Sequence, residues 1–403
     1  MSLLIAILGL ALLIFVHEAG HFFAARLVGM SPSRFYIGFP PALAKVQRRG
    51  IEYGIGAIPL GGYVKIPGMH RPAPSDVDIH FGPALQEAPP LVGPVDRLRR
   101  VLGDGQMDDA GAAVEDVKWA VDHASLSPRA RRAAERGVRE VQEGLSRGAY
   151  WRQPVWKRIA VIFAGPGTNV LFAVVLFAAL FMAGGGEATR TVAEVFPDRP
   201  ATSVGLRGGD VILGINGRSL TPEEIRTTIA DSKGKPLTLR VRRNGEVRLL
   251  GPVRPAKEGG VYRLGFALRG ARLEPPAALW RSVRLTGLVT KQIGVSLGNL
   301  VHGKGRKDIA SPVGIVQGSS TALTESVQSY LWVLGLISLS LALLNLLPLL
   351  PLDGGHIAFS VVEGIRGRAV GREIYERVSA VGIALVVLLF FVGLSNDISR
   401  IGG

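Results

Sequence analysis

The sequence predicts a multi-span α-helical membrane protein with about four transmembrane helices, a membrane-associated β-hairpin sheet and an inserted β-rich domain. Three observations support this fold class. Of the 403 residues, 47% are hydrophobic, and they are concentrated in four long, nearly uncharged segments. Short alternating segments with glycine and proline between them follow the first apolar segment. A polar region large enough to form a domain separates the second apolar segment from the third.

The four apolar segments cover residues 3–28, 159–183, 331–350 and 378–394. A helix that rises about 1.5 Å per residue needs about 20 residues to cross a hydrocarbon layer of about 30 Å. In lipid each segment must be helical, because no other local structure satisfies its backbone donors and acceptors. The first segment lacks the basic start and the small-residue exit of a signal peptide. We therefore expect it to be retained as a membrane span.

The polar region between the first two spans begins with a predicted sheet. Residues 34–39, 52–58 and 61–66 alternate between apolar and polar positions and are bounded by glycine and proline. This pattern predicts a small hairpin-rich sheet.

The region then changes character at about residue 70. It starts as a proline-rich loop and becomes charged and alanine-rich over 108–124 and 127–147. The periodicity predicts two soluble helices of mixed charge. Nothing in this insertion, which occupies residues 70–152, indicates a specific role.

A second polar region separates the second and third spans. Strands are predicted at residues 191–196, 210–215, 237–242 and 246–250. A helix is predicted at 221–229, with Thr221 as its N-cap and Glu224 three residues later. The segment around 279–297 is partly amphipathic, which is compatible with a position along the membrane surface.

The formal net charge is +15. In a soluble protein this charge would suggest binding to nucleic acid, but the sequence contains no basic patch interleaved with aromatic residues. In a membrane protein, basic loops lie against anionic lipid headgroups. We therefore expect membrane lipid and no nucleic acid among the partners. The chain has no cysteine, which excludes disulfides and thiolate metal sites.

The first span contains the sequence His17-Glu18-Ala19-Gly20-His21. Two histidines four residues apart project from one face of a helix and suit one metal ion, while Glu18 is placed to take a proton from water. Zinc at such a site lowers the pKa of a bound water to about 7 and polarises a carbonyl. Ionisable groups within a span are costly and are functional candidates by default. The alternative is a buried polar cluster that joins helices.

A catalytic zinc needs a third protein ligand and an open coordination position. Residues 345–356 are the only other place where an acid and a histidine adjoin a span. Pro348 breaks the helix there, and irregular backbone at membrane depth is tolerated only where it lines a protein cavity. Asp353 and His356 are both candidate ligands, and spacing alone leaves the choice open.

Several motifs together resemble the site-2 protease family of intramembrane zinc proteases. They are the His17–His21 motif, Asn345, Pro348, Leu352-Asp353-Gly354, and the segments 58–65 and 163–169 that match the bacterial branch. The β-rich insert resembles a PDZ domain through residues 205–212 and 215–217. Bacterial members usually have a short connection where this chain carries its 70–152 insertion.

The resemblance implies a zinc endopeptidase with Zn²⁺ held by His17, His21 and Asp353, and with Glu18 as the catalytic base. It also implies that substrate adds as a strand to the hairpin sheet. The substrate-binding residues would be Gly62, Tyr63, Asn345 and Pro348.

By the same resemblance, the substrates are single-span membrane proteins, either anti-sigma factors or remnant signal peptides, and the process is regulated intramembrane proteolysis. The PDZ-like domain would filter or recruit them. The location would be the bacterial inner membrane, with both termini and the PDZ-like domain outside the cytoplasm.

The expected order of domains follows from these assignments. It is transmembrane helix 1 with the zinc motif (1–30), the membrane-associated hairpin (31–69), the soluble insertion (70–152), transmembrane helix 2 (153–184), the PDZ-like domain (190–268), the amphipathic connection (269–328), transmembrane helix 3 with the third ligand (329–358) and transmembrane helix 4 (376–396).

Two other classes of protein remain as alternatives. A membrane scaffold or chaperone would keep the fold without the chemistry, although the four residues that the chemistry needs are all present. A metal transporter would also bury histidine and aspartate, but no internal repeat typical of transporters is visible.

Overall fold

The structure is a computed structural model that describes residues 1–185, 188–258, 260–306 and 309–401. It divides into two compact units. The first unit comprises Met1–Ala173, Val289–Ser326 and Leu336–Gly403, and the second comprises Val174–Leu288 and Val327–Gly335.

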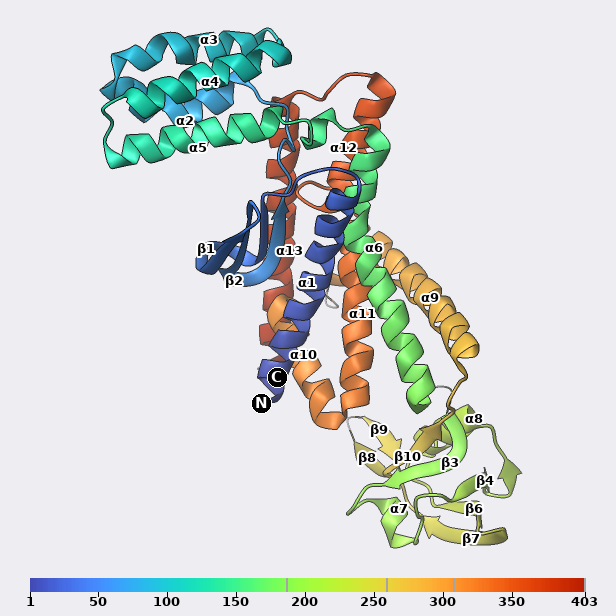
Figure 1. The fold of residues 1–403 in the computed structure, drawn as a ribbon. Coiled ribbons are helices and arrows are strands. Elements are labelled where there is room, and N and C mark those ends of the chain that lie inside the picture. Colours follow the sequence, from blue (N-terminus) through green and yellow to red (C-terminus); the bar gives the residue numbers. More distant parts are fainter. Residues whose placement is uncertain (186–187, 259, 307–308, 402–403) are drawn as a thin grey trace. The chain divides into compact units, whose positions relative to one another are not determined.

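The helices are α1 (Ser2–Leu27), α2 (Pro74–Glu87), α3 (Val92–Gly103), α4 (Met107–His123), α5 (Pro128–Leu145), α6 (Val155–Leu180), α7 (Pro200–Ser203), α8 (Pro222–Ala230), α9 (Pro275–Val301), α10 (Pro312–Glu325), α11 (Val327–Asn345), α12 (Asp353–Arg366) and α13 (Arg372–Ile401), with short helical turns at Pro89–Leu91, Tyr150–Arg152 and Phe181–Gly185 (Figure 1). The strands are β1 (Arg34–Arg48), β2 (Ile51–Lys65), β3 (Ala188–Val195), β4 (Val211–Ile215), β5 (Arg218–Ser219), β6 (Leu237–Arg243), β7 (Glu246–Val253), β8 (Ala256–Glu258), β9 (Val261–Arg263) and β10 (Phe266–Gly270).

Four helical segments of the described residues are long and apolar enough to cross a membrane: Ser2–Leu27, Val155–Gly185, Val327–Asn345 and Glu373–Arg400. The predicted number of spans is therefore confirmed. The third apolar segment, 331–350, was predicted to contain a helix break at Pro348, and its helix ends at Asn345. Pro348 accounts for the early end, since a proline disfavours helical geometry in the residue before it and removes a backbone donor.

The strands β1 and β2 form one two-stranded sheet beside α1 (Figure 1). The first four residues of β1 pair with two parts of β2, residues 52–55 and 62–65. The second half of β1 pairs with residues 51–56 across the turn at Arg49 and Gly50. The sequence analysis ended this strand at residue 39 because Pro40 and Pro41 follow. The strand continues past them because a proline is tolerated where a strand's N–H is not needed for pairing.

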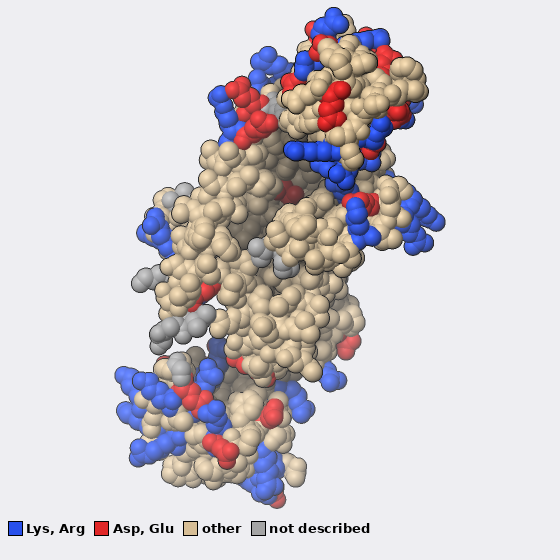
Figure 2. All heavy atoms as spheres, turned by 90° about the vertical axis from the view of Figure 1, so that its left-hand side faces the viewer, with Lys and Arg blue, Asp and Glu red and all other residues tan. Residues whose placement is uncertain are grey.

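The insertion folds into four helices, α2 to α5, around a core of its own. The two predicted helices correspond to α4 and α5. The predicted proline-rich loop extends only to residue 73, and the helices α2 and α3, which follow it, were not predicted. Pro74 occupies the first turn of α2, where a helix tolerates proline because the missing N–H has no intrahelical acceptor. Phe81, Leu91 and Leu98 are fully buried in the core. Charged side chains gather on the outside of this bundle, whereas the surface of the spans carries few of them (Figure 2).

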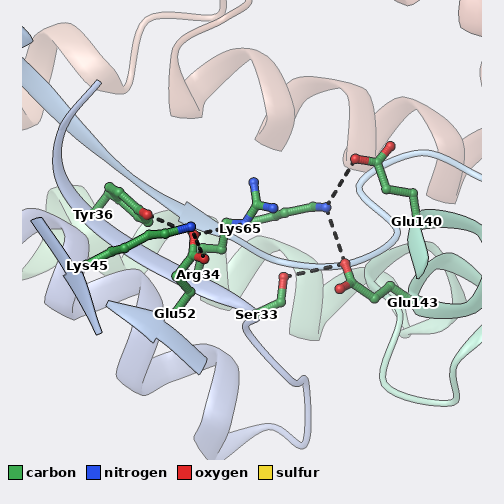
Figure 3. A network of polar contacts seen from close by, with 8 residues as sticks. All are labelled: Ser33, Arg34, Tyr36, Lys45, Glu52, Lys65, Glu140 and Glu143. Carbon is green, nitrogen blue, oxygen red and sulfur yellow. Dashed lines mark hydrogen bonds and ion pairs between the residues drawn. The ribbon is translucent and has the colours of Figure 1, made fainter. Parts of the chain in front are cut away.

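A chain of polar contacts joins the insertion to the hairpin sheet (Figure 3). Lys65, the last residue of β2, places its Nζ 3.2 Å from Glu143 Oε2 and 3.6 Å from Glu140 Oε1, both on α5. On the sheet itself, Tyr36 donates a hydrogen bond of 2.7 Å to Glu52. This bond, together with the ammonium of Lys45, holds the pKa of the Glu52 carboxyl below its usual range.

The second unit contains a β domain around a six-stranded sheet with the order β10-β3-β4-β6-β7, and β5 pairs with β4. The predicted capping of α8 is confirmed: Thr221 Oγ1 accepts from the N–H of Glu224, and the Glu224 carboxylate accepts from the N–H of Thr221. The strands that the sequence analysis missed, β5, β8, β9 and β10, have at most five residues each. Periodicity is weakest in such short segments.

Asp210, just before β4, links the loop at Arg207 to Arg243 at the end of β6. The Arg243 guanidinium donates two hydrogen bonds of 2.7 Å to its carboxylate, and the N–H of Arg207 donates a third of 2.9 Å. Burial alone would raise the pKa of Asp210, but the hydrogen bonds and charge of Arg243 outweigh it and hold this pKa below its usual range.

We predict that Asp210→Asn destabilises the β domain by about 1.5–3 kcal/mol at neutral pH, because hydrogen bonds to a charged acceptor are lost. Since the pKa is lowered on folding, the carboxylate stabilises the fold above its unfolded pKa of about 3.9 and loses that effect as the pH falls below the folded pKa. Amide hydrogen exchange of β4 and β6 in the full chain checks both points. The difference between variant and wild type should be large near pH 7 and small at strongly acidic pH. Equal protection of the two proteins at neutral pH would contradict the prediction.

Candidate metal centre

The helix α1 carries His17, Glu18 and His21 inside its apolar length, and all three are buried. The two imidazole rings lie edge to face with centroids 4.9 Å apart, and their Nε2 atoms are 3.3 Å apart. Because four residues make slightly more than one helical turn, both rings face the same side of α1. This side points toward the start of α12.

Asp353 is the first residue of α12 and supplies a carboxylate to the two histidines. Its Oδ2 atom lies 3.1 Å from His17 Nε2 and 3.4 Å from His21 Nε2. Among the described residues, these three form a group whose ligand atoms could hold one metal ion. Zinc bonds of about 2.0–2.1 Å in a tetrahedron separate the ligand atoms by roughly 3.3 Å, so the three donors fit this metal.

The broken segment between α11 and α12 brings Asp353 to the histidines. The backbone oxygens of Leu346 and Leu347 lie so close to Gly354 that a Cβ there would overlap both, and Gly355 has the same relation to the backbone of Leu349. The two glycines therefore let the chain turn back on itself tightly before α12 begins.

The start of α6 packs closely against α1 behind the histidines. Thr168 Oγ1 donates a 3.0 Å hydrogen bond to Val16 O, and His21 Nδ1 lies 2.9 Å from Val161 O. The second contact fixes the ring so that Nε2 faces the other donors, which is the usual arrangement of a metal-binding histidine. Gly165 lies directly under this ring, and a Cβ there would overlap the imidazole.

Glu18 faces the hairpin sheet. A Cβ at Gly62 of β2 would lie 2.8 Å from Glu18 Cγ and 2.7 Å from Tyr36 O, so only glycine leaves room for this carboxylate. The next residue, Tyr63, stacks on Tyr36 with ring centroids 5.1 Å apart. Of the predicted substrate-binding residues, Gly62 is thus in direct contact with a predicted catalytic residue.

The remaining predicted site residues lie at the break after α11. Asn345 ends that helix and is partly buried, and its amide makes no hydrogen bond to any residue the structure describes. Pro348 is exposed. His356, the other candidate ligand, turns away to Tyr375, whose hydroxyl lies 2.5 Å from its Nδ1, so it does not join the three donors.

Two contributors to the centre were not singled out by the sequence analysis. Gly165 belongs to a motif that was noted only for its resemblance, and Val161 contributes a backbone oxygen, which leaves no trace in a sequence. The small residue at position 165, next to Pro166 in an apolar span, was the one available signal, because small residues mark close helix packing in membranes.

Four apolar helical spans, with two buried imidazoles, the buried carboxylate of Glu18 and the partly buried carboxylate of Asp353, define a multi-span membrane metalloenzyme. The comparisons with known proteins make this class specific. The sequence model of peptidase family M50 matches residues 5–389, and the chain belongs to this family of site-2 proteases. It is a zinc metalloprotease with Zn²⁺ as its cofactor.

Relatives match over nearly their whole length. A protein of Agrobacterium fabrum named as a candidate zinc metalloprotease is 31% identical, over 98% of this chain and 95% of its own. The zinc metalloprotease RasP of Geobacillus kaustophilus is 29% identical, over 96% and 95% respectively. The probable protease eep of Enterococcus faecalis is 28% identical, over 96% of each chain.

The glycines around the centre allow a prediction that separates metal binding from catalysis. Gly165→Ala should displace the His21 ring and weaken zinc binding about 10–100-fold, as losses of ligand support usually do. Gly62→Ala should leave zinc bound but displace Glu18 and lower peptidase activity by up to about 100-fold. Zinc content by elemental analysis and cleavage of a single-span substrate measure the two effects.

Gly167→Ala is the matched control on α6, because its Cβ would meet only the ring edge of Phe163, at 3.3 Å. This half-exposed ring is free to move. Loss of zinc in the control, or full activity in Gly62→Ala, would contradict the assignment.

Proposed function

We propose that this protein is an intramembrane zinc endopeptidase that cleaves the transmembrane segments of single-span membrane proteins in regulated intramembrane proteolysis. The observation that carries the proposal is the convergence of three donor atoms within 3.4 Å of one another, beside a fourth ionisable group, Glu18, inside an apolar helix. A metal-dependent hydrolysis of a peptide bond inside a membrane can use this combination of a metal site and a carboxylate base.

We assign the metal to His17, His21 and Asp353. Bound zinc would lower the pKa of a water molecule, so that hydroxide is available at neutral pH, and it would also polarise the carbonyl of the substrate. The distances between the three donors support the assignment, and three protein ligands leave the fourth position open for water or substrate. Val161 O orients His21 for this role.

Glu18 is the proposed general base. Its carboxylate takes a proton from the attacking water and later delivers it to the nitrogen of the leaving amine. Burial between α1 and β2 keeps this carboxylate close to the donors and away from bulk water, and Gly62 leaves the space that it occupies.

The substrate is proposed to bind as an added strand along β2. Residues 62–65 pair with β1 on one side, and among the described residues no strand pairs with their other side. An unpaired edge offers backbone donors and acceptors to an extended peptide. An added strand exposes the peptide carbonyl that a transmembrane helix would keep hydrogen-bonded. Gly62 and Tyr63 lie on this segment, and Asn345 and Pro348 are the further proposed contacts.

Glu18→Gln should lower cleavage of a single-span substrate by about 10²–10⁴-fold, the usual contribution of general acid–base catalysis, while the zinc content stays unchanged. The measurement is cleavage in detergent alongside elemental analysis of the same preparation. A zinc chelator should abolish cleavage by the wild type. Full cleavage by the variant would exclude Glu18 as the base and leave the metal assignment intact.

The β domain of the second unit is proposed to be a PDZ-like domain that controls access of substrates. Its sheet order and the N-capped α8 are compatible with such a domain. As a filter, it would admit only substrates whose extramembrane part has been removed. As a recruiter, it would bind an extended peptide end at a strand edge.

Deletion of residues 190–268 distinguishes the two roles. Loss of a filter should permit cleavage of substrates that still carry their extramembrane domain, whereas loss of a recruiter should abolish cleavage of trimmed substrates. Cleavage of trimmed and untrimmed versions of one substrate is the measurement, and zinc content confirms that the membrane part is folded. We expect the filter result.

The proposed location is the bacterial inner membrane, with both termini and the PDZ-like domain outside the cytoplasm. The proposed substrates are membrane-anchored anti-sigma factors or remnant signal peptides.

A further inference from the structure

A cavity of about 990 Å³ lies away from the metal centre, at the C-terminal end of α1. Three parts of the first unit line it: residues 26–33, the turn of the β1–β2 hairpin, and the last turn of α5 with the residue after it. The metal centre and the proposed substrate-binding residues do not contribute to it.

The lining of this cavity is strongly basic. Arg26 comes from the last turn of α1, and Arg48 and Arg49 come from the hairpin turn. Among the residues the structure describes, no carboxylate forms an ion pair with any of these three guanidiniums. Glu143 also lines the cavity, and it shares the Lys65 ammonium with Glu140, at 3.2 and 3.6 Å respectively. The lining therefore has three guanidiniums and one carboxylate, and its net charge is positive.

The cavity lies where the chain leaves the membrane. Lys157 Nζ donates a 2.9 Å hydrogen bond to Val28 O, so α6 begins at the level where α1 ends. Trp156, the neighbouring residue, is 63% exposed. Exposed tryptophan is typical of the membrane–water interface. Both spans thus reach the interface at the cavity.

The other walls are less polar. Met30, Val46, Ile51 and Tyr53 line the cavity beside the arginines. A ligand that fits must carry an anionic group for the guanidiniums and an adjoining apolar part. Phosphate suits arginine well, because its oxygens accept two parallel hydrogen bonds from one guanidinium.

We propose that this cavity binds the phosphate of an anionic phospholipid headgroup from the leaflet in which α1 ends. The glycerol and the first methylenes of the lipid occupy the apolar walls. A free phosphate has the same anionic group but no apolar part to contact the apolar walls. An acidic peptide without apolar residues likewise has nothing to place against the apolar walls. Basic pockets beside transmembrane helices are a recurrent form of lipid headgroup site.

The test uses the full chain in detergent and calorimetric titration with short-chain phosphatidylglycerol. Parallel titrations use short-chain phosphatidylcholine, inorganic phosphate and an oligo-aspartate peptide. The variant is Arg26→Gln/Arg48→Gln/Arg49→Gln. The matched control, Arg129→Gln/Arg132→Gln/Arg136→Gln, removes the same charge from exposed positions of α5.

We expect phosphatidylglycerol to bind the wild type and the control alike, and the cavity variant at least about tenfold more weakly, because each basic residue near an anionic lipid contributes about a factor of five. Phosphatidylcholine should bind weakly to all three proteins. Unchanged zinc content shows that the variants are folded. If the triple variant does not fold, Arg48→Gln/Arg49→Gln in the exposed turn replaces it, with an expected loss of about tenfold.

Several outcomes would overturn the proposal. Equal binding of the two lipids, absence of binding, or an equal loss in the control would exclude a specific headgroup site. Displacement of the lipid by equimolar inorganic phosphate would assign the cavity to a free anion. Binding of the peptide but not of the lipid would assign it to an acidic protein segment. None of these results bears on the zinc site.

Discussion

A charged side chain at the centre of a membrane-spanning helix costs roughly 2.5–3.5 kcal/mol on insertion scales, and α1 carries three ionisable residues within five positions. This cost is tolerable only where the groups meet partners inside the protein. Asp353 is the partner that the structure provides for His17 and His21, with its Oδ2 3.1 and 3.4 Å from their Nε2 atoms. The arrangement of the surrounding elements follows from this requirement.

A carboxylate can reach α1 only if the helix that would carry it is interrupted. The break between Asn345 and Asp353 provides the interruption, and Gly354 lets the backbone turn within it. The ring of His21 must also be held from behind, which requires α6 to approach closely. Gly165 permits this approach, and a hydrogen bond from Thr168 to the backbone of α1 stabilises it. The hairpin then closes the side where Glu18 lies.

The sequence alone was sufficient to predict the number of spans and the helix break at Pro348, since both depend on local composition and on proline geometry. It also supplied His17, Glu18, His21 and Asp353 as candidates. Spacing alone left the choice between Asp353 and His356 open and the family resemblance made it, because the choice depends on which side chain turns toward α1 and which turns to Tyr375. Spacing along the chain contains no such information.

Two helices, half of a strand and one polar contact were not predicted, because each depends on contacts that the local sequence does not determine. The helices α2 and α3 were taken for a loop because prolines that begin helices and prolines that break them look alike in a sequence. The strand β1 was ended before Pro40 because a proline usually interrupts a strand, whereas residues 42–48 still pair with residues 51–56 across the hairpin turn. The contact of Lys65 with Glu140 and Glu143 joins a strand to a helix more than 70 residues away, and only the fold reveals it.

The separation of the donors along the chain has a consequence for biosynthesis. His21 and Asp353 are 332 residues apart (353 − 21). At about 5–20 residues per second, a ribosome needs roughly 15–65 s to reach Asp353 after His21. Until then the nascent chain carries the proposed base, Glu18, but only two of the three proposed ligands, His17 and His21. The proposed centre is thus completed only when the last spans of the protein have been inserted.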